Sequence, residues 1–206
     1  MKDHKRSCIL LTLIFVLMFV FFSVIACSKN LSRDKAALLI KNYLSKSTEQ
    51  FIPHESISFN KYDNSKNKHM IQVSSLGGQR AKSIAQALSK AGLISFSFEG
   101  TEDIWATKVE WYAVDFLKQG QPYILSPYKS NYSYDLNLRT HDIERVEVTG
   151  LSKGDNNQTQ AVFTIEFKTN IVGQCFNINK NITKKGKAFL NLFDDGWRVE
   201  KVEIDE

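Results

Sequence analysis

An apolar run near the N-terminus constrains this chain more than any other feature. Residues 9–25 are apolar except for Thr12 and Ser23, and the run ends in the small residue Ala26, directly before Cys27. A positively charged segment precedes the run, with Lys2, Lys5 and Arg6 opposed only by Asp3. A charged start, an apolar stretch and a small residue before the cut are typical of a secretory signal. We therefore expect the chain after Ala26 to fold outside the cytoplasm.

The residues around the expected cleavage site carry a more specific mark, formed by Val24, Ile25, Ala26 and Cys27. This pattern resembles the lipobox of bacterial lipoprotein signal peptides, and the resemblance covers the first 28 residues. It implies cleavage between Ala26 and Cys27. It also implies acylation of Cys27, with a diacylglyceryl thioether and an N-acyl chain such as palmitate, which together make a firm membrane anchor. Ser28, where Asp would signal retention, resembles the outer-membrane address of Gram-negative lipoproteins. The implied location is the cell envelope, on the outer membrane and facing the periplasm.

An uncleaved membrane anchor is the alternative interpretation of the same segment. The apolar run is close to the lower limit of about 17 residues for a spanning helix. Val24 is larger than the residue that a general secretory signal places three positions before the cut, which favours the lipoprotein interpretation. Both interpretations place the rest of the chain outside the cytoplasm.

Charge and cysteine content limit the functions of the mature part. The 180 residues after Ala26 carry 24 basic and 21 acidic side chains, a net charge near +3. Proteins that bind nucleic acids usually carry a clustered excess of basic side chains, and this small net charge is not such an excess. We therefore expect no nucleic-acid partner. The expected partners are a lipid bilayer, reached through Cys27, and proteins of the envelope. Cys175 is the one cysteine after Cys27, so no intramolecular disulfide is expected. We interpret Cys175 as a buried apolar residue, with a reactive thiol as the alternative.

Helical spacing dominates our interpretation of residues 33–120. After a lipidated tether at residues 27–32, Ser32 is a suitable N-cap for a first helix. The apolar stripe of this helix is Ala36, Leu39, Ile40, Tyr43 and Leu44. We interpret the stripe as core, with a membrane-lying helix as the alternative. A second helix from about Gln79 to a stop at Gly92 has an apolar face of Ala81, Ile84, Ala85 and Leu88. Residues 60–68 are predicted to form an exposed loop, and strands are predicted at 71–73, 93–98 and 108–117.

The last part of the sequence predicts a sheet. Residues 121–142 predict an irregular connection, and residues 143–206 predict antiparallel strands. Turn residues at 154–157 and 194–196 indicate two hairpins. Residues 146–151, 161–164 and 193–199 resemble the curved antiparallel sheet of cystatin-like and nuclear-transport-factor-like lipoproteins, which implies a fold but no binding residue. The predicted fold class is therefore α+β, with an N-terminal helix-rich half followed by a curved antiparallel β-sheet.

No part of the sequence carries a catalytic motif. Nucleophile elbows, zinc-protease motifs and phosphate loops are absent from it. The histidines after Cys27 are too far apart for a typical zinc site, and each is interpreted as a surface or loop residue: His54, His69 and His141. We predict no catalytic residue, no metal site and no cofactor.

Aromatic side chains form the one candidate ligand groove, which consists of Trp105, Trp111, Tyr123 and Tyr128. Aromatic residues anchor interfaces, although packing in a core or on a sheet explains these side chains as well and is their more frequent role. The leading hypothesis is a membrane-anchored, non-catalytic binding or assembly module. One alternative is an exclusion or immunity lipoprotein that blocks an incoming protein. The other is an envelope hydrolase, which would need carboxylates or histidines that converge in a pocket. A grouping of Cys175, His141 and Asp142 can also be imagined.

Overall fold

The computed structural model of this chain describes residues 30–46, 51–63, 68–75, 77–129, 134–154 and 157–205. The apolar run, the lipobox of residues 24–27 and Ser28 lie outside the described residues. Signal cleavage and lipidation at Cys27 therefore stay predictions.

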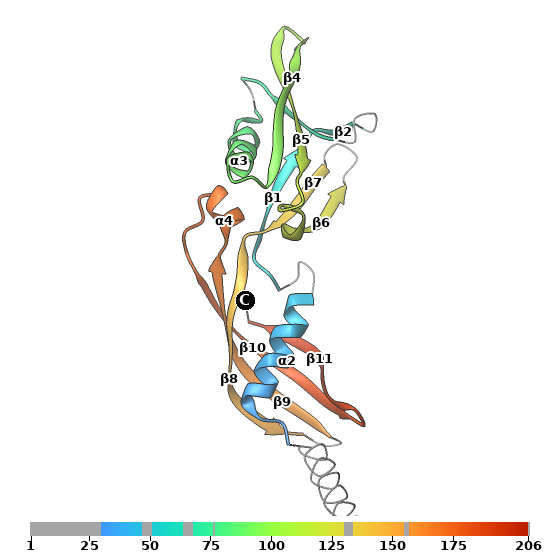
Figure 1. Cartoon of the computed structure of the whole chain (residues 1–206), viewed down its shortest axis with the longest axis vertical. Helices are drawn as coiled ribbons and strands as arrows, with labels where there is room; N and C mark the ends of the chain where they lie inside the picture. Colours follow the sequence, from blue (N-terminus) through green and yellow to red (C-terminus); the bar gives the residue numbers. More distant parts are fainter. Residues whose placement is uncertain are drawn as a thin grey trace, which may run out of the picture.

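The described chain forms an elongated molecule with two lobes that meet at a narrow waist (Figure 1). The α2 lobe consists of α2 (Arg33–Lys46), β8 (His141–Lys153), β9 (Gln158–Thr169), β10 (Ile182–Phe193) and β11 (Gly196–Ile204). The α3 lobe consists of β1 (His54–Phe59), β2 (Lys61–Asp63), β3 (Lys68–Val73), α3 (Gln79–Lys90), β4 (Ile94–Ile104), β5 (Thr107–Phe116), the 3-10 helix η1 (Gln121–Tyr123), β6 (Ile124–Lys129), β7 (Tyr134–Arg139) and α4 (Ile171–Cys175). Each lobe has its own hydrophobic core.

In the α2 lobe, one helix covers a four-stranded antiparallel sheet of order β11-β10-β9-β8. Ser32 caps the helix as predicted, because its Oγ accepts a hydrogen bond from the Lys35 N–H at 3.2 Å. Three residues of the predicted stripe are fully buried against the sheet: Ala36, Ile40 and Leu44. The interpretation of the stripe as core is thus confirmed, as are both predicted hairpins.

The α3 lobe combines a four-stranded sheet of order β2-β3-β5-β4 with a three-stranded sheet of order β1-β7-β6. Helix α3 follows the predicted bounds closely, and its buried residues are Ile84, Ala85 and Leu88. These side chains share a core with Ile57 of β1 and Ile71 of β3, so the helix holds the two sheets together.

The predicted α+β class with a helix-rich N-terminal half is wrong. The described residues are about 58% strand and 22% helix, and seven of the eleven strands lie between His54 and Arg139. Strands β6 and β7 lie within residues 121–142, which were predicted to be irregular, and β2 lies within the predicted loop at 60–68. These strands escaped prediction because they are short, and because β1 finds its partner β7 only across a long sequence separation. Local periodicity carries no signal for such a pairing.

The two lobes are linked at a junction formed by Pro53, Thr140, His141, Asn170 and Lys180. Both the backbone N–H and the hydroxyl of Thr140 donate to the Pro53 carbonyl, each at 3.0 Å. The Asn170 N–H donates to the Thr140 carbonyl at 3.0 Å, and Nε2 of His141 lies 3.0 Å from the Lys180 carbonyl. Because each of these residues lies where the chain passes from one lobe to the other, the hydrogen bonds tie the four crossing segments together.

Candidate functional site

Strand β1 lies at the edge of its sheet, since the order is β1-β7-β6. It pairs with β7 from His54↔Arg139 to Phe59↔Tyr134. An edge strand presents a row of backbone N–H and C=O groups that can pair with another chain. The residues of β1 whose backbone groups face away from β7 therefore determine what this edge can bind.

Two hydrogen bonds show which residues of β1 turn their backbone groups away from β7. Thr140 N–H donates to the Pro53 carbonyl, so the Pro53 carbonyl points toward β7. The backbone groups of the residues that follow point alternately away from β7 and toward it. Asn60 N–H donates instead to the Met70 carbonyl of β3, at 2.9 Å, on the opposite side of the strand. Both bonds give the same alternation, in which the backbone N–H and C=O groups of Ser56 and Ser58 face away from β7.

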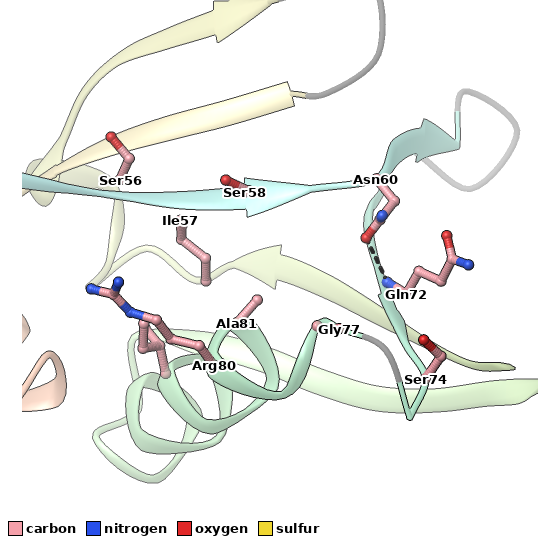
Figure 2. A pocket seen from close by; sticks show the side chains of 11 residues that line it. Ser56, Ile57, Ser58, Asn60, Gln72, Ser74, Gly77, Arg80 and Ala81 are labelled. Carbon is pink, nitrogen blue, oxygen red and sulfur yellow. Dashed lines mark hydrogen bonds between the residues drawn. The ribbon is translucent and has the colours of Figure 1, made fainter.

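The opposite wall of the site is formed by residues 71–73 of β3, which lie beyond its pairing with β2, and by the turn that follows. The side chain of Asn60 bridges the two strands, because its Oδ1 accepts from the Gln72 N–H at 2.8 Å. From Asn60 back toward Ser58 and Ser56, β1 moves away from β3 (Figure 2). The turn after β3 is closed by a hydrogen bond from the Ser74 N–H to the Gly77 carbonyl at 2.9 Å.

Gly78 allows α3 to start directly beside β3. Its φ is +84°, and a Cβ at this position would lie 2.0 Å from the Gln72 carbonyl oxygen. Only glycine fits such a close approach and such a backbone angle. No side chain caps the N-terminus of α3 and no acidic residue lies in its first turn. The site therefore receives the partial positive charge of a helix N-terminus.

These elements enclose a cleft of about 520 Å³ between β1, β3 and the start of α3. Its size is within the range of about 300–1,000 Å³ that is usual for ligand sites. The lining residues are Ser56, Ile57, Ser58, Asn60, Gln72, Ser74, Gly77, Gly78, Arg80, Ala81 and Ile84.

The lining of this cleft is suited to binding. It combines an apolar floor of Ile57, Ala81 and Ile84 with hydroxyl and amide groups, and no carboxylate, imidazole or thiol is among its described residues. The Arg80 side chain is 81% exposed, and its guanidinium lies 3.9 Å from the Glu55 carboxylate. An ion pair this long and this exposed contributes little free energy, so Arg80 remains available to a bound anion.

The predicted aromatic groove residues occupy separate places in the α3 lobe. Trp105 lies in the turn between β4 and β5. Nε1 of Trp111 donates to Glu102 at 3.1 Å. Tyr123 of η1 packs on the core, with the Arg139 guanidinium 5.5 Å from its ring centroid. Tyr128 is on β6, and its side chain is not among those described. None of these residues lines the cleft.

The three residues of the imagined hydrolase grouping each have structural partners, and Asp142 pairs with Arg139 at 3.2 Å. Nδ1 of His141 lies 2.9 Å from the Thr140 hydroxyl, and Nε2 contacts Lys180 and Thr169, so the ring belongs to the junction. The interpretation of His141 as a surface or loop residue is wrong, because it is buried. Cys175 is half-buried against the core of the α3 lobe, and burial raises the pKa of its thiol. A raised pKa disfavours the reactive thiolate.

A second cavity, of about 500 Å³, lies in the α2 lobe. It is lined by apolar residues such as Leu31 and Trp197 and by polar residues such as Lys153 and Gln158. In the described part of the chain, no group of three or more His, Cys, Asp or Glu side chains is placed to hold a metal ion. None of the described helices is both long and apolar enough to span a membrane.

No protein-family model matches this chain, and searches of the curated proteins and of the solved structures each found no match.

His69 gives a pH-dependent stability prediction. Its ring lies 4.8 Å from the ring of Phe59 and 6.2 Å from that of Phe116, measured between centroids. Burial lowers its pKa below the ordinary value of 6.5, and Asp115 offsets this in part. As the pH falls, His69 is therefore protonated near pH 6.5 in the unfolded chain but only at a lower pH in the folded chain. We expect the His69 contribution to stability to be complete above pH 6.5 and lost as the pH falls below it.

Urea unfolding at pH 7.5 and pH 5.5 measures this effect. We expect the protein to lose more unfolding free energy between the two values than His69→Phe does, because phenylalanine keeps the ring and removes the titration. Asp115→Asn should increase the loss, since it removes the charge that raises the pKa. Equal losses in the parent protein and in His69→Phe would contradict the prediction.

Proposed function

We propose that this chain is a non-catalytic binding module of the cell envelope, which takes up an extended segment of a partner protein along the free edge of β1. The observation that carries the proposal is the outward direction of the Ser56 and Ser58 backbone groups, at the side of a cleft. Among the described strands, none pairs with that edge of β1 at Ser56 or Ser58.

Strand addition uses the groups that this cleft presents. An extended peptide beside β1 gains main-chain hydrogen bonds from Ser56 and Ser58, which are the source of affinity in this mode of recognition. Its alternate side chains point into the cleft, where Ile57, Ala81 and Ile84 offer apolar contact. Arg80 and the N-terminus of α3 favour a carboxylate at one end of the segment.

The envelope location rests on the lipobox. Acylation of Cys27 would tether the α2 lobe close to a membrane, because few residues separate Cys27 from the start of α2 at Arg33. A tethered module with a peptide cleft suits the assembly or capture of envelope proteins.

A proline at position 58 tests the strand-addition model. Proline lacks the backbone N–H, and at Ser58 that N–H faces the cleft and not β7. Ser58→Pro should therefore remove one bond to the peptide while preserving the pairing with β7. The probe is a labelled peptide, selected from a random library on the full-length protein in detergent. We expect Ser58→Pro to weaken binding at least tenfold in fluorescence anisotropy.

The matched control is Ser58→Ala, which changes the side chain at the same position and keeps the N–H. It should change the affinity less than twofold, and both variants should unfold at nearly the temperature of the parent protein. The proposal fails if selected peptides bind Ser58→Pro as tightly as the parent, or if the library yields no binder.

Intact mass and membrane fractionation test the tether. We expect the full-length protein to lose residues 1–26 and to gain acyl mass at Cys27, and we expect both changes to be absent from Cys27→Ala. An uncleaved chain that fractionates with the inner membrane in both forms would instead identify a single-span anchor.

A further inference from the structure

The hairpin of β4 and β5 ends in an unusual turn. Ile104 pairs with Thr107, so Trp105 and Ala106 form a two-residue connection. Their φ angles are 49° and 59°. Positive φ at both positions is the geometry of a type I′ turn, which strongly favours Asn-Gly because bulkier residues strain the backbone there. A tryptophan at this position costs the fold conformational free energy.

Burial of the ring does not compensate for this cost. Trp105 is 96% exposed, the highest value among the exposed large hydrophobic residues of the described chain. Figure 1 shows the β4–β5 hairpin projecting at one end of the molecule, while the start of α2 lies toward the other end. The hairpin therefore presents a large aromatic side chain to the surroundings, at a cost in local strain and in exposed apolar surface. Backbone strain that folding does not require points to function.

The charges beside Trp105 select the class of partner. Glu102 and Asp103 precede it and Lys108 follows it, which leaves the tip with a net charge of −1. Aromatic residues that insert into anionic membranes are accompanied by lysine and arginine, which attract the lipid headgroups. An acidic tip has the opposite preference, and it matches a protein surface with basic side chains.

We propose that Trp105 is the anchor of a docking tip, which inserts into an apolar pocket bordered by basic residues on a partner protein. Tryptophan is among the residues that contribute most to binding energy at protein interfaces, because it fills a pocket while acidic neighbours pair at the rim. This surface is separate from the cleft beside β1. The proposal does not depend on strand addition, although the proposed tether at Cys27 would direct the tip away from the membrane.

Photo-crosslinking in intact cells of the native host tests the docking tip. The photoreactive residue p-benzoylphenylalanine replaces Trp105 in the full-length protein and keeps a large apolar ring at the tip. The matched control carries the same residue at Phe193, an exposed aromatic side chain beside the β10–β11 turn. We expect a discrete protein adduct from position 105 and none of the same mass from position 193. Adding Asp103→Lys to the position 105 protein should reduce the adduct at least fivefold, because it reverses the charge that pairs with the basic rim.

Other outcomes would overturn the proposal. They are adducts only with lipid or with a second copy of this chain, the same adduct from both positions, an adduct unaffected by Asp103→Lys, or no adduct. None of these variants alters β1. Failure of the docking-tip proposal would therefore not affect the peptide-binding test at Ser58.

Discussion

The paired hydrogen bonds from Thr140 to the Pro53 carbonyl determine most of what is distinctive in this structure. They fix where β1 begins against β7, and in a strand a shift of one residue would exchange its two faces. With this register, Ile57 and Phe59 enter the core, and the backbone of Ser56 and Ser58 faces the cleft. A slipped register would bury the serines and would point a different set of backbone groups toward α3.

The same residues explain how the two lobes are joined. The chain leaves the α2 lobe after its first helix, builds most of the α3 lobe, and returns through Thr140 into β8. Between β9 and β10 it enters the α3 lobe once more to form α4, whose residue Val172 belongs to that core. Gly173 makes this possible, because a Cβ there would lie 2.4 Å from the Thr140 carbonyl oxygen. The junction is therefore polar, closely packed and intolerant of larger residues.

What the sequence could predict follows from the range of its interactions. Helices α2 and α3, with their buried faces, and the strands of the α2 lobe were predictable because their periodicity and turns are local. In the α3 lobe, the strands predicted at 71–73, 93–98 and 108–117 correspond to β3, β4 and β5. Strands β1, β2, β6 and β7 were not predicted, because the pairing of β1 with β7 depends on contacts between distant residues. The alternation of Ile57 and Phe59 with serines was the available signal for β1 as a half-buried strand. No local signal shows that the outer edge of β1 stays unpaired. In the sequence alone, Arg80 looks like an ordinary charge on a helix surface, because only the fold places α3 beside that edge.

The proposed function depends on the direction of the β1 backbone groups, which residue-resolved amide hydrogen exchange of the full-length protein measures. We expect slow exchange at Ile57, whose N–H bonds to β7, and fast exchange at Ser56 and Ser58 on either side of it. The Asn60 amide, which bonds to Met70, should again be protected. If Ser56 and Ser58 were as protected as Ile57, the edge of β1 would already be occupied and no strand could be added there.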